Sequence, residues 1–357
     1  MTQPSERATR PTLADVAAAS GVAISTVSRA LTRPERVNAA TRERIELAAK
    51  QLGYTANTSA RALTSGQTRS VAVLVSDVTN PFYFGIIRGT QQELKTAGYT
   101  QLLVDTEESD ELEDATLKRL RSSYDGVILA ASRLTDRRLS ELAERIPLVA
   151  INRQTRGVPS VFIDTPLGVG HAVEHLVSHG HRRIAYAAGP VTSWSNERRW
   201  RALKAGAERL GVEVVRVGPF SPRKIQGAAA ADAVLNTGAT ACVAFNDLLA
   251  IGMLGRFAER GVSVPDDISV VGCDDIFGAD FCNPPLTTIT APIEQAGRVA
   301  VSILLAQLNG AGTAGRHAAT LPTHLTIRES SGPAPAPAAA PAAAAASQAS
   351  AEGGRGR

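Results

Sequence analysis

Polar side chains stand at the ends of several apolar runs in this 357-residue sequence, and their chemistry is that of ligand binding. Four such runs end in Asp77, Asn152, Asn246-Asp247 and Asp274-Asp275. A carboxylate or an amide can hold a pair of hydroxyl groups. Because ligands of open α/β folds bind at the carboxyl ends of the strands, we expect these side chains to converge on one cleft. The pattern predicts a site for a polyhydroxylated small molecule.

The sequence offers little for catalysis. No GxGxxG follows an apolar run, and neither GxxxxGK[ST] nor GxSxG occurs. Histidines recur at i, i+4 and i+8, with a fourth close by, and could be read as a metal cluster: His171, His175, His179 and His181. Neither their spacing nor a carboxylate partner matches a known metal site, and the three cysteines also lack such spacing. We expect a protein that is not an enzyme, with no metal and no cofactor.

A second kind of chemistry is indicated by the first 66 residues, which hold all the excess positive charge. They contain nine Lys and Arg against five Asp and Glu, an excess that equals the net charge of +4 of the whole chain. A basic module attached to a neutral body is typical of proteins in which one part meets the phosphates of a nucleic acid. The simpler alternative is a solvated basic surface.

The stretch TLADVAAASGVAISTVSRAL, residues 12–31, predicts two short helices joined by a glycine turn. Thr12 and Asp15 form a capping box, Ser20-Gly21 ends the first helix, and the second covers about 23–31. A third helix follows, with a cap at Asn38. This arrangement is that of a helix-turn-helix, whose second helix fits the major groove of DNA.

The outward positions of the second helix suit base recognition. Arg29 can form two parallel hydrogen bonds with guanine, and Ile24 can contact a thymine methyl group. The residues expected to contact DNA in this unit are Thr12, Leu13, Ile24, Ser25, Thr26, Ser28 and Arg29. The alternative is a small three-helix bundle that binds another protein.

Beyond residue 70 the pattern changes to near-continuous apolar runs separated by amphipathic stretches. The runs are 71–77, 101–106, 126–131, 147–152, 183–189, 242–247 and 268–275. Such a pattern favours parallel sheets covered by helices on both faces, and its length favours two similar lobes. We expect the chain to pass between the lobes near 160–164 and 288–292.

The stretch 12–31, followed by VNAATRERIELAAKQLGY, resembles the lactose-repressor/galactose-repressor (LacI/GalR) family of bacterial transcription regulators. The resemblance covers nearly all of residues 12–330. It implies an all-α helix-turn-helix headpiece and an α/β, two-lobed core like the periplasmic sugar-binding proteins. Three positions depart from the family's usual residues: Ala23 replaces serine, Thr32 replaces asparagine and Ala56 replaces proline. Loss of the hydroxyl at Ala23 removes a helix cap and a phosphate contact.

The resemblance also implies a hinge helix at about 58–63, capped by Asn57 and too short to be stable alone. In the family this helix forms on DNA, pairs with its twin in the minor groove and inserts a leucine between two central base pairs. Leu63 holds that position, and Arg61 is expected to contact DNA beside it. The partners are then a palindromic operator with a central CG step and a second copy of the chain. The alternative is that Leu63 packs on the next domain.

The family's pocket loops match VTNPFYFGIIRG, GPVTSWSNERRW, GPFSP, FNDLLAIG and VGCDDIFGADFCNPPLTTI. The effector contacts implied by the match are Asp77, Asn80, Phe82, Tyr83, Asn152, Ser195, Arg199, Phe220, Asn246 and Asp274. Structural alternatives are helix caps at Asp247 and Asp275 and a core position for Phe82. The family's dimer surface is expected to include PPLTTI.

We therefore expect a headpiece at 11–56, a hinge at 57–69, a core at 70–330 and a disordered Ala/Pro-rich tail at 331–357. With no secretory signal and no apolar run long enough for a membrane, we expect a cytoplasmic protein. The interpretation is a dimeric repressor of carbohydrate-utilisation genes, switched by a sugar-like effector. Alternatives are control by a phosphocarrier protein, a purine or nucleoside effector, and a sugar-binding or sugar-converting protein.

Overall fold

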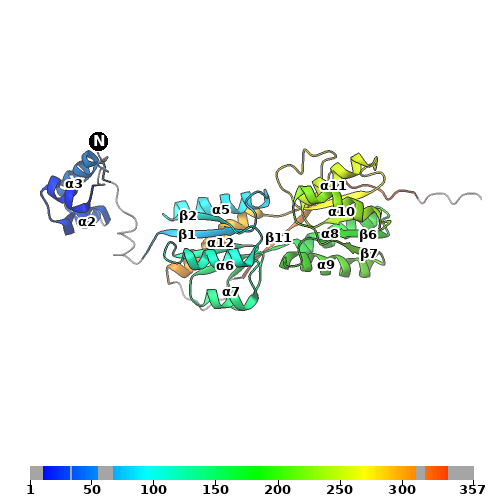
Figure 1. Cartoon of the computed structure of the whole chain (residues 1–357), viewed down its shortest axis with the longest axis horizontal. Coiled ribbons are helices and arrows are strands. Elements are labelled where there is room, and N and C mark those ends of the chain that lie inside the picture. The colour runs from blue at the N-terminus through cyan, green and yellow to red at the C-terminus, as the bar shows by residue number, and fades with distance from the viewer. Residues whose placement is uncertain (1–10, 33, 55–66, 311–317, 337–357) are drawn as a thin grey trace, which may run out of the picture.

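The computed structural model describes residues 11–32, 34–54, 67–310 and 318–336 (Figure 1). The expected hinge helix, with Asn57, Arg61 and Leu63, lies outside the described residues, as does most of the expected tail. Within the described part of the chain, no helix is long and apolar enough to cross a membrane.

The N-terminal unit, which we call the headpiece, has the three expected helices: α1 (Leu13–Ser20), α2 (Ile24–Thr32) and α3 (Ala39–Leu52), with a short 3-10 turn, η1 (Pro34–Arg36), between the last two. The capping box of Thr12 and Asp15 is confirmed. Gly21 ends α1 at φ 66°, a backbone conformation that favours glycine. The unit has its own small core: Val16, Ala17, Val27, Ala30, Ile45, Ala48 and Ala49.

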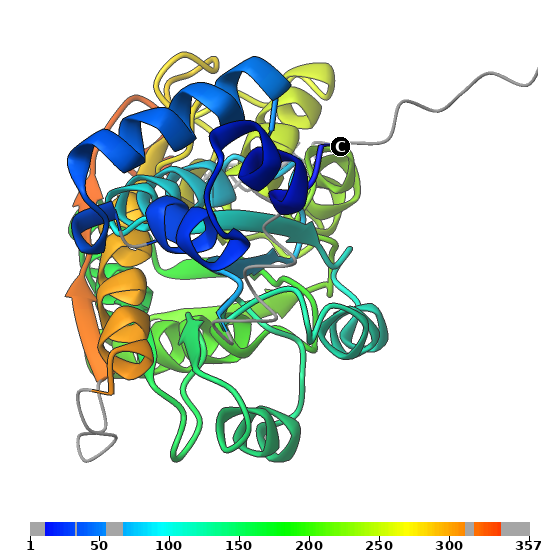
Figure 2. The same cartoon turned by 90° about the vertical axis from the view of Figure 1, so that its left-hand side faces the viewer.

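The body consists of two lobes, each with a six-stranded sheet (Figure 1), and in the end-on view of Figure 2 the lobes lie one behind the other. The N lobe has the order β11-β5-β4-β3-β1-β2, all parallel. Its strands are β1 (Ser70–Val75), β2 (Thr100–Asp105), β3 (Gly126–Ala130), β4 (Leu148–Ile151), β5 (Ser160–Asp164) and β11 (Ala318–Pro322). The C lobe has the order β12-β10-β9-β8-β6-β7, and β12 is antiparallel to β10. Its strands are β6 (Arg183–Ala187), β7 (Glu213–Val217), β8 (Ala241–Ala244), β9 (Ser269–Asp274), β10 (Thr287–Thr290) and β12 (His324–Thr326).

Helices cover both faces of each sheet, as the continuous apolar strands require. In the N lobe, α5 (Phe82–Thr96) and α12 (Ile293–Leu308) cover one face, and α6 (Asp110–Arg119) and α7 (Asp136–Ala143) cover the other. In the C lobe, α10 (Gly227–Leu235) and α11 (Asp247–Glu259) cover one face, and α8 (Thr165–Ser178) and α9 (Trp194–Leu210) cover the other. A short 3-10 turn, η2 (Lys224–Gln226), precedes α10.

The chain crosses between the lobes three times. The crossings after β5 and β10 confirm the two expected places, and the third, between β11 and β12, was not predicted. The crossings touch: the Thr323 hydroxyl donates to the Asp164 carbonyl at 2.7 Å. A Cβ on Gly168 would lie 2.2 Å from Ile289, so glycine permits this close approach. The lobes are therefore joined by a compact hinge rather than by separate linkers.

The C-terminal boundary differs from the expectation of a tail that begins at residue 331. Ser330 is buried and donates to the Val270 carbonyl at 2.6 Å, and the backbone N–H of Ala334 donates to the His179 carbonyl at 2.8 Å. His181, also buried, lies 3.1 Å from the Gly332 carbonyl. The histidines thus anchor the end of the core, and no group of three potential ligands that could hold a metal ion is found among the described residues.

Candidate functional site

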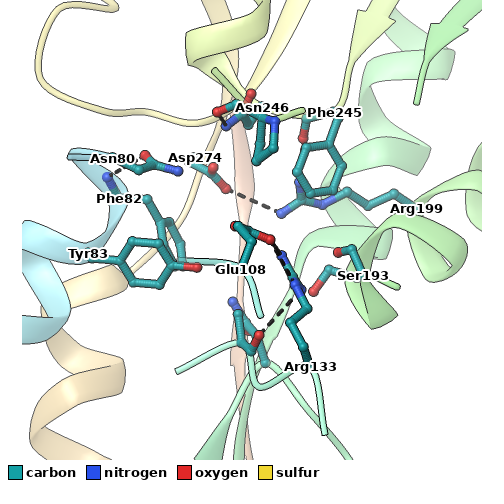
Figure 3. Close-up of a pocket in the computed structure, with 14 residues that line it drawn as sticks. Asn80, Phe82, Tyr83, Glu108, Arg133, Ser193, Arg199, Phe245, Asn246 and Asp274 are labelled. Atoms are coloured by element: carbon teal, nitrogen blue, oxygen red, sulfur yellow. Dashed lines mark hydrogen bonds and ion pairs between the residues drawn. The ribbon is translucent and has the colours of Figure 1, made fainter. Parts of the chain in front are cut away.

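A pocket lies between the lobes, at the carboxyl ends of both sheets (Figure 3). The space measures about 400 Å³, including the part that is open to solvent. The N lobe contributes Asn80, Phe82, Tyr83, Glu108, Ala131, Arg133 and Asn152, and the C lobe contributes Ser193, Ser195, Arg199, Pro222, Phe245, Asn246 and Asp274. Both lobes therefore form walls of one site.

Most of the expected effector residues lie in this pocket. They are Asn80, Phe82, Tyr83, Asn152, Ser195, Arg199, Asn246 and Asp274. The alternative of a core position for Phe82 is compatible with this placement, because Phe82 is 6% exposed and contacts Tyr83 edge-to-face with ring centroids 5.1 Å apart. The aromatic pair closes the N-lobe side of the pocket, while polar groups dominate the rest.

Asp77 and Phe220 do not line the pocket. The Asp77 carboxylate accepts hydrogen bonds from the N–H and hydroxyl of Thr79, because the chain turns tightly after β1. Its other oxygen accepts from Arg223 Nε at 3.1 Å. This contact is the one ion pair that joins the lobes among the residues described. Phe220 packs on the C-lobe core instead of forming an aromatic floor for a ligand.

The centre of the C-lobe wall is the buried pair of Arg199 and Asp274, each 4% exposed. Arg199 Nη2 donates to Asp274 Oδ1 at 3.2 Å, Nε donates to the Thr165 hydroxyl at 3.0 Å, and Nη1 donates to the Phe245 carbonyl. Burial raises the pKa of Asp274 to about 6 despite the opposing effect of the guanidinium. The wall therefore presents a fixed cation and a carboxylate side by side.

Asn246 has two roles, because it lines the pocket as expected and also forms the helix cap that was expected of Asp247. Asn246, not Asp247, caps α11: its Oδ1 accepts from the Leu249 N–H at 3.0 Å. Asp247 is fully buried and accepts from the Thr288 hydroxyl at 2.6 Å and from the Ile276 N–H at 2.9 Å. Burial, followed by the charge of Asp274, raises the pKa of Asp247 to about 7. Asp247 thereby links the region of the pocket to β10, which leads into the second crossing.

Asp275 is also not a helix cap. Its carboxylate accepts from Arg328 Nη2 at 2.8 Å and from the Thr290 hydroxyl at 2.9 Å, so it ties β10 to the segment after β12. The expected dimer segment PPLTTI is likewise mostly internal, because 286–289 are buried within the C lobe. The neighbouring Phe277 and Phe281 are instead exposed, at 79% and 63%.

The pocket contains six residues that were not predicted: Glu108, Ala131, Arg133, Ser193, Pro222 and Phe245. Glu108 and Arg133 form an ion pair, Nε to Oε2 at 2.8 Å, on the N-lobe wall. They follow β2 and β3, so the rule that polar groups gather at strand ends could have found them. They were missed because each lies three residues beyond the end of its strand and not directly at that end.

Several pocket residues have left-handed backbone conformations that non-glycine residues rarely adopt. The φ angles are 61° at Glu108, 57° at Ala131, 56° at Asn152 and 119° at Asp274. Each such residue costs of order 1–3 kcal/mol and persists only where its surroundings fix it. Their concentration around one cavity supports a functional role for it.

On the headpiece, the outer face of α2 carries the expected recognition residues. Ile24 is 53% exposed, and Ser25 and Arg29 are exposed beside it. Leu13 differs, because it packs against the headpiece core. The Thr12 hydroxyl donates to Asp15 at 2.8 Å within the capping box. Ile24, Ser25 and Arg29 thus form the surface that a DNA groove could meet.

Comparison with known proteins finds matches to both the headpiece and the body. Residues 12–57 match the profile described as bacterial regulatory proteins, lacI family, and residues 173–331 match the periplasmic binding protein-like domain. The transcriptional repressor CytR of Escherichia coli K12 is 33% identical over 310 residues, 85% of this chain and 91% of CytR. The transcriptional regulator CelR of Thermobifida fusca is 34% identical over 342 residues, 91% and 99% of the two chains.

Solved structures give the same result. The lac repressor dimer bound to operator and the anti-inducer ONPF has a TM-score of 0.81 at 27% identity, covering 90% of this chain and 99% of that one. A complex of the regulator CelR with cellobiose has a TM-score of 0.66 at 32% identity, covering 90% and 100%. The similarity therefore extends over the headpiece, both lobes and their connection.

Proposed function

The chain belongs to the LacI family of bacterial regulatory proteins, and from this premise we propose that it is a dimeric repressor of carbohydrate-utilisation genes. Members of the family are DNA-binding transcription regulators and not enzymes, so the sugar-converting alternative is set aside. In this proposal the protein acts in the cytoplasm, where the chromosome lies. A neutral sugar in the pocket between the lobes switches its affinity for the operator.

The observation that carries the proposal is that one pocket has walls from both lobes while three crossings form a single hinge. A ligand held by both walls favours one arrangement of the lobes, and it shifts the equilibrium by its difference in affinity for the two arrangements. Asp247, with Thr288 of β10 as its partner, lies between pocket and hinge. Lobe closure is therefore the first half of the switch.

The second half of the switch is the attachment of the headpiece to the N lobe. Thr68 and Arg69 lie at the end of the expected hinge, and their backbone N–H groups donate to the Asp125 carboxylate of the N lobe at 2.7 and 2.8 Å. The hinge residues expected to contact the minor groove, Asn57, Arg61 and Leu63, directly precede this anchor. In a dimer, a change in the arrangement of the lobes alters the spacing of the two anchors and hence the fit to a palindrome.

The dimer surface in this proposal includes the exposed aromatic pair after β9. Phe277 and Phe281 contact one another with ring centroids 5.0 Å apart and lie largely in solvent. Exposed apolar patches of this kind are typical of protein interfaces. A second copy of the chain is the partner that a two-headed DNA reader requires.

A nucleoside is the second candidate effector. Three aromatic side chains, Phe82, Tyr83 and Phe245, line the pocket and could stack on a base. A sugar is preferred because the remaining lining is dominated by carboxylate, amide, hydroxyl and guanidinium groups, which bind hydroxyls.

The test is selection of genomic fragments by the purified protein at near-physiological salt, repeated with Arg29→Ala. We expect one palindrome with a central CG step, and loss of about 1–3 kcal/mol of discrimination at one base pair per half-site in the variant. Addition of neutral sugars or nucleosides to the complex then identifies the effector class. Recovery of no palindrome, with or without these compounds, would contradict the proposal.

A further inference from the structure

We propose that Glu108 and Arg133 form a second hydroxyl-binding subsite, on the N-lobe wall, which reads the part of the effector that faces away from Arg199 and Asp274. The inference rests on the proposed function, because it takes the pocket between the lobes as the effector site. It goes further by assigning ligand recognition to two residues outside the loops that match the family.

The Glu108–Arg133 pair is built into the wall rather than lying on its surface. The Arg133 side chain is 6% exposed and that of Glu108 is 21% exposed. The Arg133 backbone N–H donates to the buried Glu113 at 3.0 Å, and Arg133 Nη1 donates to the Ala131 carbonyl at 3.3 Å. The Glu108 N–H donates to the Ser76 carbonyl at 2.7 Å. The backbone on both sides of the pair is therefore fixed before a ligand arrives.

The pair nevertheless keeps binding capacity on the pocket side. Nε and Nη2 of Arg133 both donate to the same oxygen of Glu108, Oε2. No partner for Glu108 Oε1 is found among the described residues. A carboxylate oxygen beside a guanidinium offers an acceptor and donors at adjacent points, which is the arrangement that one or two ligand hydroxyls require.

The two lobes present matched pairs to the same cavity. Figure 3 shows Glu108 and Arg133 on one side and Asp274 with Arg199 on the other, and all four residues line the pocket. The charges of Glu108 and Asp274 balance those of Arg133 and Arg199. An anionic ligand would meet two carboxylates and a cationic ligand two guanidinium groups, whereas an uncharged polyol can donate to and accept from each pair. The geometry therefore favours a neutral ligand with hydroxyls at opposite ends.

The experiment begins with a panel of neutral pentoses, hexoses, disaccharides and ribonucleosides, together with sugar phosphates, titrated into the full chain by calorimetry. Single-deoxy analogues of the tightest binder are then titrated into the wild type, Glu108→Gln and Glu141→Gln. Glu141 is the matched control, since it pairs with Arg137 on the exposed face of α7.

In the wild type we expect removal of a hydroxyl that faces the N-lobe pair to weaken binding at least tenfold, as a hydrogen bond to a charged group does. In Glu108→Gln, the same deoxy analogue should bind less than threefold more weakly than the parent sugar, because the partner of the missing hydroxyl is already altered. In the control Glu141→Gln, the deoxy analogue should still bind at least tenfold more weakly than the parent sugar, as in the wild type. If Glu108→Gln does not fold, Arg133→Lys enters the same comparison, since lysine cannot reproduce the fork geometry.

Two results overturn the inference, and they are distinguishable. In the first, each deoxy analogue loses the same factor of affinity in the wild type and in Glu108→Gln, while the sugar still changes operator binding. The subsite is then wrong and the proposed function stands. If no neutral member of the panel binds, or if a sugar phosphate binds more tightly than its parent sugar, both the subsite and the proposed sugar effector are wrong.

Discussion

The two walls of the pocket are built differently. On the C-lobe wall the main polar groups already have partners: Arg199 donates to Thr165, Phe245 and Asp274, and Asn246 is bonded at both ends of its amide. Such a network is rigid, and it specifies one arrangement when all its members are satisfied. The C-lobe wall is therefore a platform that exists before the ligand binds.

The N-lobe wall is held by its backbone more than by its side chains. Glu108, Ala131 and Asn152 all have left-handed conformations, and the Asn152 Oδ1 accepts from the Ile163 N–H at 3.1 Å rather than facing a ligand. Glu108 offers an oxygen to the cavity, whereas the C-lobe carboxylate, Asp274, is 4% exposed. Under the proposed function, the difference means that the C lobe fixes the ligand's position while the N lobe supplies contacts that a bound ligand completes, so that binding draws the lobes together.

The largest expected effect comes from breaking the C-lobe pair. Arg199→Met should lower the free energy of unfolding by about 3–5 kcal/mol, because it leaves the buried Asp274 carboxylate without its partner. Arg133→Met should cost less, about 1–3 kcal/mol, because the Glu108 side chain is 21% exposed and can be solvated. Urea unfolding of the full chain measures both. Equal losses, or the reverse order, would break the comparison of the walls.

A pH dependence should follow from the C-lobe carboxyls. Burial raises the pKa of Asp247 to about 7 and that of Asp274 to about 6, above the values of an unfolded chain. The folded protein then holds these protons more tightly than the unfolded chain does, so the stability that these two groups contribute is fully present below about pH 4 and is lost as the pH rises towards 6 and 7. These two groups should remove about 2–4 kcal/mol between pH 5 and pH 7. Urea unfolding across this range should show a smaller slope for Asp247→Asn, and parallel profiles would contradict this assignment.

Strain on the N-lobe wall can be measured with a smaller change. Ala131 has φ 57°, so Ala131→Gly removes a backbone penalty that offsets the usual entropic cost of glycine. We expect a change in unfolding free energy of less than about 0.5 kcal/mol. Ala229→Gly, at an exposed position of α10, should cost about 1 kcal/mol. If Ala131→Gly and Ala229→Gly lower the free energy of unfolding by the same amount, the left-handed conformation of Ala131 carries no measurable strain.

A small effect is also expected at the contact between the lobes. Arg223→Gln removes the charged partner of Asp77, whose side chain is 4% exposed, but Thr79 still donates two hydrogen bonds to the other oxygen of that carboxylate, so stability should fall by only about 1 kcal/mol. Affinity for the effector should change by a small factor, because the pair favours one arrangement of the lobes. Calorimetry with the identified sugar measures the affinity of Arg223→Gln and of Arg199→Met. A loss of affinity in Arg223→Gln as large as that in Arg199→Met would show that the ion pair between the lobes, and not the C-lobe wall, controls lobe closure.

The sequence predicted the two walls to the same extent, because four of the seven residues that line each wall were expected and three were missed. Asn246 and Asp274 stand at the ends of strands that appear as apolar runs in the sequence, whereas Arg199 was implied by the family resemblance alone. Glu108 and Arg133 enter the pocket only because the chain takes left-handed conformations at 107–108 and at Ala131, where no glycine marks the turn. The position of Asp77 was wrong for a related reason, since a tight turn redirects its carboxylate to Thr79 and Arg223.

The fold was predicted to a similar extent. The seven apolar runs are strands, and the two expected crossings are confirmed. The third crossing was missed because β11 and β12 are short and largely exposed, so they lack a continuous apolar run. The cap of α11 was assigned to Asp247 instead of Asn246 because both residue types cap helices well, and only tertiary packing against Thr288 decides between them.

The central claim is that the pocket and the DNA-reading headpiece share one equilibrium. If the effector changes the protein's affinity for the operator by some factor, linkage requires that the operator change the protein's affinity for the effector by the same factor. The most direct measurement is therefore the effector's dissociation constant for the full chain, free and saturated with its operator. We expect the two constants to differ at least tenfold, about 1.4 kcal/mol, and to match the change in operator affinity at saturating effector. Equal constants would mean that ligand binding between the lobes does not control the headpiece.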